Sequence, residues 1–343
     1  MYIFALNKNK SIRLNRKQLI SNLKSVTENS FESAALDLFR YQYINNSIYK
    51  SWVDSLNVKV NDINVLKDIP FLPISAFKTH EVKSQKGRGS HIFTSSGTTG
   101  SITSKHLVFD MNLYLNNTEV IFSQFYNDIS AYCYLALLPN YLEREGSSLV
   151  AMVEHFINKS NYSESGFYLY DHGQLNSKLN HCQKENIPTV LFGVSFALLD
   201  YLEIYRHEYP ELIIIETGGM KGRKKEMTKS KLQELLANGF GVRNIHSEYG
   251  MTELFSQSYS KESGIFTAAR SMKVLTKEIT DPFQNAPVGK SGVINIIDLA
   301  NIDSCAFIET QDLGRIYADG SFEVLGRLDQ ADIRGCNLMV SDL

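Results

Sequence analysis

The stretch "FTSSGTTGSITSKHLVFD", residues 93–110, concentrates serine, threonine and glycine between apolar residues. Backbone N–H groups of a glycine-rich loop, supported by hydroxyl groups, form a concave donor surface that suits phosphate oxygens. A Walker P-loop closes with Gly-Lys-Ser/Thr and runs directly into a helix. Here Lys105 stands five residues after Gly100 and leads into a strand-like segment. This spacing argues against an ordinary P-loop kinase or ATPase, and a purely structural polar loop remains the alternative.

The segments that follow this stretch predict a layered α/β core. Buried strands are expected in "SAYCYLALLP" (130–139) and "PELIIIETGG" (210–219), because both are short apolar runs bounded by polar or turn residues. A helix is expected in "GSSLVAMVEHFIN" (146–158), and a strand, turn and helix in "IPTVLFGVSFALLDYLEIYRH" (187–207). Alternating strands and helices indicate an α/β fold.

The two ends of the chain differ from this core. Residues 1–60 carry apolar residues at helical spacing and predict packing helices. After residue 262 the sequence becomes β-rich, with "ADGS" (318–321) as a tight hairpin turn. We therefore expect two units, residues 1–262 with the helical N-terminus and the α/β core, and residues 263–343 as a smaller β-rich subdomain.

Composition narrows the classes of function. The 343 residues include 35 basic and 37 acidic side chains without a like-charge block, so nothing indicates a nucleic-acid partner. The N-terminus is the reverse of a secretory signal and no segment approaches a membrane span, which predicts a cytoplasmic protein. The cysteines show no metal-ligand spacing and are expected to be reduced thiols: Cys133, Cys182, Cys305 and Cys336.

The stretch "NIHSEYGMTELFSQSY" (244–259) adds a second group of chemically suited residues. Tyr249 offers an aromatic face for a base, Thr252 a hydroxyl for a phosphate, and Glu253 a carboxylate for Mg²⁺. Gly250 is the small residue between them. A turn with no ligand is the alternative for this stretch considered alone.

A third group lies in "IETQDLGRIYADGSFEVLGRLDQADIRG" (308–335). Asp312 could accept hydrogen bonds from ribose hydroxyls, and Arg327 could reach the same sugar or a phosphate. Considered alone, a strand-end aspartate and a surface arginine are the structural alternatives.

In this order the motifs resemble those of the adenylate-forming superfamily, which converts a carboxylate and ATP into acyl-AMP. "SSGTTG" looks like its phosphate loop, "YGMTE" its central motif, and "QDLGR" with "LGRLD" its ribose and hinge motifs. "FLPISAFKTHEV" and a chain ending shortly after "RGC" resemble the LuxE-type acyl-protein synthetases, with phenylacetate-CoA ligases as near relatives. The resemblance implies a large layered α/β domain with a C-terminal β-rich subdomain and without the mobile lid domain.

The resemblance also implies roles for individual residues. Tyr249, with Gly250 beside it, would stack on adenine, Thr252 would contact the α-phosphate, and Glu253 would bind Mg²⁺. Asp312 would bridge the ribose hydroxyls with the help of Arg327. The loop that cradles the β- and γ-phosphates of ATP would comprise Ser95, Ser96, Gly97, Thr98, Thr99 and Gly100. The adenine edge would face Gly218, Gly219 and Met220, and the acyl side Gly193, Val194 and Ser195. His246 is a further substrate-binding candidate, with a structural histidine as the alternative.

After adenylation a thiol would receive the acyl group. In LuxE-type enzymes it is a cysteine of the enzyme near the C-terminus, and Cys336 matches it, with Arg334 and Arg327 favouring the thiolate. Candidates to replace the lid lysine are Lys105, Lys221 and Arg223. The expected substrate is a small-molecule carboxylate, with a fatty acid favoured. The alternatives are transfer to CoA or an acyl carrier protein, an acyl reductase or acyltransferase partner, and a nucleotide-binding homologue without turnover. The oligomeric state stays open.

Overall fold

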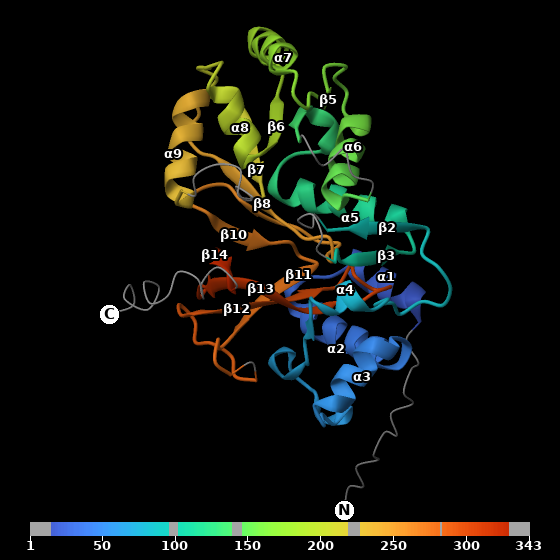
Figure 1. The fold of residues 1–343 in the computed structure, drawn as a ribbon. Helices are drawn as coiled ribbons and strands as arrows, with labels where there is room; N and C mark the ends of the chain where they lie inside the picture. The colour runs from blue at the N-terminus through green and yellow to red at the C-terminus, as the bar shows by residue number, and fades with distance from the viewer. Residues whose placement is uncertain (1–14, 96–101, 139–145, 219–226, 282, 329–343) are drawn as a thin grey trace, which may run out of the picture.

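A computed structural model describes residues 15–95, 102–138, 146–218, 227–281 and 283–328 (Figure 1). Within these ranges twelve strands form one hydrogen-bonded sheet, in the order β11-β12-β13-β14-β10-β9-β8-β7-β6-β4-β5, with β1 paired to β13. The sheet joins a parallel half to an antiparallel half, and the candidate site lies where the two halves meet.

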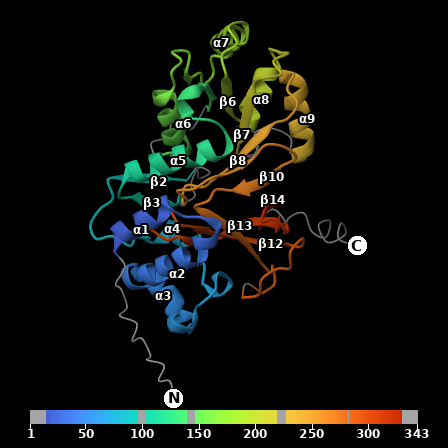
Figure 2. The ribbon, with the colours of Figure 1, turned by 180° about the vertical axis from the view of Figure 1, so that it is seen from behind.

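The parallel half confirms the predicted α/β core. Its strands pair in parallel from β5 to β8, and β4, β6 and β7 are buried, largely apolar runs. The five strands are β4 (Cys133–Leu137), β5 (Gly166–Phe167), β6 (Thr189–Val194), β7 (Ile213–Thr217) and β8 (His246–Tyr249). Helices α8 and α9 lie on one side of β6–β8, and α5 and α6 on the other (Figures 1 and 2). The helices here are α5 (Met111–Phe125), α6 (Ser148–Lys159), α7 (His172–Lys184), α8 (Ser195–Leu202) and α9 (Lys229–Phe240). A helix was expected after a turn near residue 194, but α8 begins directly after β6.

The antiparallel half confirms the β-rich character of the later sequence. Its strands are β9 (Ser258–Ser260), β10 (Ile265–Ala268), β11 (Met272–Lys277), β12 (Ser291–Asp298), β13 (Phe307–Ile316) and β14 (Phe322–Arg327). The predicted "ADGS" turn joins β13 to β14, where Gly320 has a φ of +81° and Tyr317 N donates to Ser321 O at 2.8 Å. Because β10 pairs with both β9 and β14, the sheet continues across residues 262 and 263. The division into two units there stays a prediction.

Three N-terminal helices lie beside the antiparallel half of the sheet, with α2 and α3 at the bottom of Figure 1. They are α1 (Arg16–Lys24), α2 (Glu28–Asn45) and α3 (Ser47–Ser55). Asn46 separates the last two, since its side chain accepts from Tyr49 N and so caps the start of α3. Phe39 and Tyr49 pack on Phe307 of β13 at ring-centroid distances of 6.0 and 5.8 Å. This contact anchors the helical layer to the sheet.

Short elements connect the helical layer to the core: η1 (Val60–Asp62), η2 (Leu66–Asp68), β1 (Leu72–Pro73), α4 (Ala76–Thr79) and η3 (Ile129–Ala131). Strands β2 (His91–Thr94) and β3 (Lys105–Val108) form a separate antiparallel hairpin, which confirms the strand predicted after Lys105. Cys133, Cys182 and Cys305 are buried free thiols, as predicted. Among the described residues, no helix combines the length and the apolar character needed to cross a membrane.

Candidate active site

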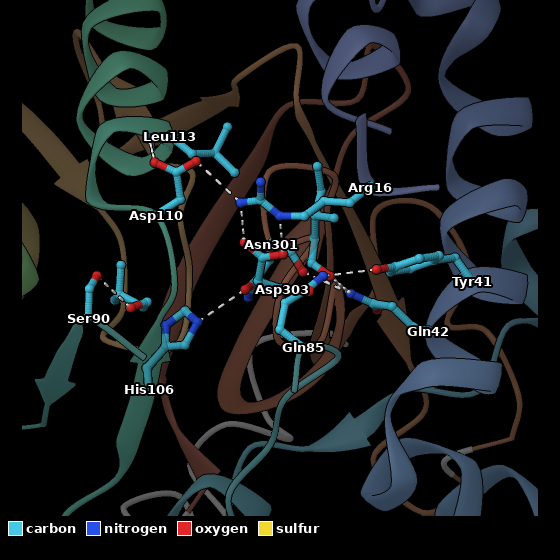
Figure 3. Close-up of polar contacts among 12 residues, drawn as sticks. Arg16, Tyr41, Gln42, Gln85, Ser90, His106, Asp110, Leu113, Asn301 and Asp303 are labelled. Carbon is cyan, nitrogen blue, oxygen red and sulfur yellow. Dashed lines mark hydrogen bonds and ion pairs between the residues drawn. The ribbon is translucent and has the colours of Figure 1, made fainter. Parts of the chain in front are cut away.

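The backbone of the "YGMTE" segment is held by two side chains from distant parts of the chain, His106 and Asn301, which lie next to each other in Figure 3. His106 Nδ1, on β3, lies 2.8 Å from the Thr252 carbonyl oxygen, and Asn301 Nδ2 donates to the Glu253 carbonyl oxygen at 2.7 Å. His106 Nε2 lies 3.1 Å from Asn301 Oδ1. Burial lowers the pKa of His106 to about 4, so at pH 7 the neutral ring has a single N–H to donate. The Thr252 carbonyl oxygen, at 2.8 Å, is closer to the ring than Asn301 Oδ1, at 3.1 Å, and is the acceptor of this N–H.

A partly buried ion pair near Asn301 joins the helical layer to this segment. Arg16 of α1 donates to both carboxylate oxygens of Asp303, at 2.7 and 2.6 Å, and reaches Asp110 Oδ2 at 3.3 Å (Figure 3). Asp303 follows Asn301 by two residues, and its side chain is only 3 % exposed. The bidentate geometry fixes the backbone near Asn301 more firmly than a single hydrogen bond does. The N-terminal helices therefore help to position the "YGMTE" segment.

The Glu253 carboxyl group contacts Ser104, which follows the predicted phosphate loop in the sequence. Glu253 is 5 % exposed, and burial raises the pKa of its carboxyl group. A hydrogen bond from Ser104 and the charges of Lys78 and Arg327 act in the opposite direction and lower this pKa. Ser95 and Ser104 pair with each other, with Ser95 N donating to Ser104 O at 3.2 Å and Ser104 N donating to Ser95 Oγ at 2.9 Å. Glu253 therefore lies beside residues that flank positions 96–101.

The donor set around Glu253 fits Mg²⁺ bound jointly with a nucleotide. No group of three histidine, cysteine, aspartate or glutamate side chains that could hold a metal occurs among the residues that the structure describes. Mg²⁺ in nucleotide sites is commonly held by one or two carboxylates together with substrate phosphates and water. Glu253 could supply that single carboxylate.

Tyr249 and Asp312 bring two of the sequence motifs into contact. Tyr249 ends β8, and its hydroxyl donates to Asp312 Oδ2 on β13 at 2.9 Å. Arg327 faces Asp312 across the β13–β14 pair, with Nε 4.0 Å from Asp312 Oδ1. Burial raises the pKa of Asp312, while the Tyr249 hydrogen bond and the Arg327 charge lower it. The Arg327 side chain is 55 % exposed, so it can reach a bound molecule.

The predicted acyl-side residues are buried at the end of β6. Gly193 leaves room for Leu198, because a Cβ at residue 193 would lie 2.5 Å from Leu198 Cδ2. Val194 and Ser195 are 1 % and 0 % exposed. Ser195 contacts Glu216 and the carbonyl oxygen of Gly218, so the predicted acyl side touches the predicted adenine edge. Their substrate-binding roles stay predictions.

A second buried carboxyl group, Glu248, precedes the "YGMTE" motif. Thr217 Oγ1 donates to Glu248 Oε2 at 2.8 Å. Burial, together with the neighbouring Glu216 carboxyl group, raises the pKa of Glu248 to about 7. Gly250 lies close beside it, because a Cβ at residue 250 would lie 2.4 Å from Glu248 Oε1 and would displace that side chain. The polar residues within the short strand "HSEY" were the sequence signal for this group.

Two further predicted residues, His246 and Lys105, lie within the described ranges. His246 is the first residue of β8, at the opposite end from Tyr249, and its Nδ1 lies 2.9 Å from the Tyr126 hydroxyl. Lys105 is exposed at the start of β3, next to Ser104. Their roles stay predictions. The predicted residues outside the described ranges are Ser96, Gly97, Thr98, Thr99, Gly100, Gly219, Met220, Lys221, Arg223, Arg334 and Cys336.

Asp298 is a structural carboxylate that the sequence reading missed. It lies at the end of β12 with no exposed surface, and it accepts from Phe255 N, Ser256 N, Ser256 Oγ and Ala300 N at 2.6–3.1 Å. These bonds fix the chain directly after the "YGMTE" motif. The only sequence signal was an acid at the end of the buried run "INII".

Asp298→Ala is therefore expected to lower the free energy of unfolding by about 3 kcal/mol or more, because buried donors lose their acceptor. Urea denaturation measures the change. Asp62→Ala, at an exposed residue of η1, is the matched control and is expected to change stability by less than about 0.5 kcal/mol. Equal stability of the two variants would contradict the role given to Asp298.

The mixed sheet with helices on both faces of its parallel half is the fold of adenylate-forming ligases, which confirms the predicted fold class. The chain is similar to 2-hydroxyisobutyryl-CoA ligase in complex with 2-HIB-AMP and CoA, with a TM-score of 0.65, 12 % identity, and 90 % of this chain and 77 % of that chain covered. It is also similar to ATP-bound MatB from Rhodopseudomonas palustris, with a TM-score of 0.54, 16 % identity, and 71 % and 49 % covered.

A third similar structure is O-succinylbenzoate coenzyme A synthetase (MenE) from Bacillus subtilis with ATP and magnesium ion. Its TM-score is 0.52 and its identity 18 %, with 71 % of this chain and 51 % of that chain covered. The chain thus spans about half the length of MatB and MenE. No family model and no curated protein matches the sequence.

Proposed function

We propose that this protein activates a carboxylic acid with ATP to form acyl-AMP and pyrophosphate. The observation that carries the proposal is the convergence of residues predicted separately from the sequence. Tyr249 binds Asp312, and Glu253 contacts Ser104, which follows the predicted phosphate loop in the sequence. The fold shared with adenylate-forming ligases supports the same reaction.

In the proposed reaction a carboxylate oxygen of the acid attacks the α-phosphorus of ATP, and pyrophosphate leaves in line with the attack. Asp312 would accept hydrogen bonds from the ribose hydroxyls, and Thr252 would contact the α-phosphate. Mg²⁺ held by Glu253 would neutralise charge on the phosphate oxygens. The clamp of His106 and Asn301 on the Thr252 and Glu253 carbonyls keeps these side chains in place.

The second half of the proposed reaction passes the acyl group to a thiol. The thiolate attacks the acyl carbonyl, a thioester forms, and AMP leaves. Cys336 of this chain is one candidate acceptor, as in a LuxE-type acyl-protein synthetase with a reductase or acyltransferase partner. CoA or a carrier-protein thiol is the other, and the similar 2-hydroxyisobutyryl-CoA ligase structure holds CoA.

Exchange of labelled pyrophosphate into ATP, over a panel of fatty, aryl and hydroxy acids, tests the first half-reaction. We expect exchange that depends on both Mg²⁺ and one class of acid. ATP binding without exchange for any acid would overturn the proposal and favour a nucleotide-binding protein without turnover.

Cys336→Ser is expected to keep acid-dependent pyrophosphate exchange and to lose acyl retention on the protein. The reason is that adenylation does not use this thiol, whereas transfer requires a thiolate that serine cannot supply at neutral pH. Intact mass measurement after incubation with ATP and an active acid, before and after neutral hydroxylamine, reads out the thioester. A hydroxylamine-sensitive acyl mass on the serine variant would contradict acylation of Cys336, as would a wild-type protein that never gains the mass.

A further inference from the structure

Ser195 stands between two acceptor oxygens and has one proton to donate. Its hydroxyl forms a hydrogen bond with Glu216 Oε1 and lies 2.6 Å from the Gly218 carbonyl oxygen. If Glu216 were ionised, all three atoms would be acceptors with a single hydrogen between them. One of the two contacts would then be a repulsion between lone pairs. Both contacts are satisfied only if Glu216 also carries a proton.

We propose that Glu216 is a protonated carboxylic acid that donates to Ser195, so that Ser195 donates to the Gly218 carbonyl. Glu216 is a positioning residue, because it acts through Ser195 on the backbone. The inference rests on the proposed function for its consequence, since Ser195 and Gly218 belong to the predicted acyl side and adenine edge. This chain of two hydrogen bonds, from Glu216 to Ser195 and from Ser195 to the Gly218 carbonyl, is called the relay below, and it joins the two predicted subsites.

The surroundings of Glu216 support the neutral form. The residue is 9 % exposed at the end of β7, and burial raises the pKa of its carboxyl group. From β8, Glu248 lies close to Glu216, so ionisation of either carboxyl group opposes ionisation of the other, whereas the Ser247 hydroxyl favours ionisation of Glu216. From α9, Lys229 also favours ionisation, but burial lowers the pKa of this lysine and weakens its charge.

Lys229 has a second attractor besides Glu216. Its Nζ lies 4.3 Å from the centroid of the Phe266 ring on β10, a cation–π distance, and Glu323 on β14 also attracts its charge. The positive charge is therefore shared among several groups. Ser195 is therefore the main hydrogen-bonding partner of the Glu216 carboxyl group.

The relay ends on the carbonyl oxygen of Gly218, whose backbone conformation favours glycine. Gly218 follows β7 with a φ of +73°, in the left-handed region that favours glycine. The Ser195 bond fixes its carbonyl oxygen in that conformation. When Glu216 loses its proton at high pH, Ser195 is drawn to the carboxylate and the Gly218 carbonyl loses its donor. We therefore expect adenylation to decline on the alkaline side because of Glu216.

Infrared difference spectroscopy tests the proton directly and without activity. A protonated carboxyl group absorbs at higher frequency than a carboxylate, and at pH 7 the wild type is expected to show such a band that Glu216→Gln lacks. Glu248→Gln is the matched control and is expected to keep the Glu216 band. A spectrum of Glu216→Gln that equals the wild type would overturn the proposal, even if the protein catalyses no exchange.

The pH profile of pyrophosphate exchange tests the positioning role. The amide of Glu216→Gln can still donate to Ser195, so this variant is expected to lose the alkaline decline and to exceed Glu216→Ala about tenfold at pH 7. Ser195→Ala is expected to resemble Glu216→Ala. A wild type without an alkaline decline, or a Glu216→Gln variant with an unchanged decline, would overturn the role of the relay. Absence of exchange in the wild type would instead contradict the proposed function.

Discussion

Glu253→Gln is expected to lower Mg²⁺-dependent pyrophosphate exchange at least about 100-fold while leaving the fold intact. The substitution keeps the size of the side chain and an oxygen that can accept from Ser104. It removes the negative charge, and a hard cation binds a carboxylate much better than an amide. Burial already disfavours the charged form of Glu253, so the neutral amide is not expected to lower the stability of the protein.

The measurement compares exchange rates at several Mg²⁺ concentrations, with thermal unfolding as the check on folding. Glu234→Gln is the matched control, because Glu234 lies on the exposed surface of α9 in an ion pair with Lys231. It is expected to exchange like the wild type. Near wild-type exchange by Glu253→Gln would contradict the metal-binding role of the central motif.

Local sequence patterns were sufficient to predict the central strands β4, β6 and β7. Buried runs such as "CYLAL" and "IIIET" can form strands with both faces covered, and the structure places them as β4 and β7. "YGMTE" and "QDLG" contain side chains whose chemistry is recognisable without knowledge of their neighbours. The contact between Tyr249 and Asp312 then follows from the fold.

The supporting residues could not be predicted because their partners are distant in the chain. His106 contacts a carbonyl oxygen 146 residues away, and Glu216 meets Ser195 from the neighbouring strand. A histidine in "SKHLVFD" or a glutamate in "IIIETGG" carries no local sign of such a partner. The boundary between α2 and α3 depends on one capping residue, Asn46, within an otherwise continuous helical pattern.

Asp312→Ala is expected to weaken ATP binding about 10- to 100-fold and to leave binding of the acid nearly unchanged. A carboxylate that accepts from two ribose hydroxyls makes charge-assisted hydrogen bonds of about 1.5–3 kcal/mol each, of which part is recovered by water. Isothermal titration calorimetry with ATP measures the change. Unchanged ATP affinity would show that Asp312 is only a turn aspartate.

Tyr249→Phe separates the nucleotide contact of Asp312 from its bond within the protein. The Tyr249 hydroxyl already donates to Asp312 Oδ2, and Arg327 faces Oδ1, so the carboxylate is oriented before a nucleotide arrives. Removing the hydroxyl leaves the carboxylate and the aromatic face, and we expect a loss of ATP affinity of no more than about tenfold. If Tyr249→Phe weakened ATP binding as much as Asp312→Ala, the bond between the two side chains, rather than a ribose contact, would account for both losses.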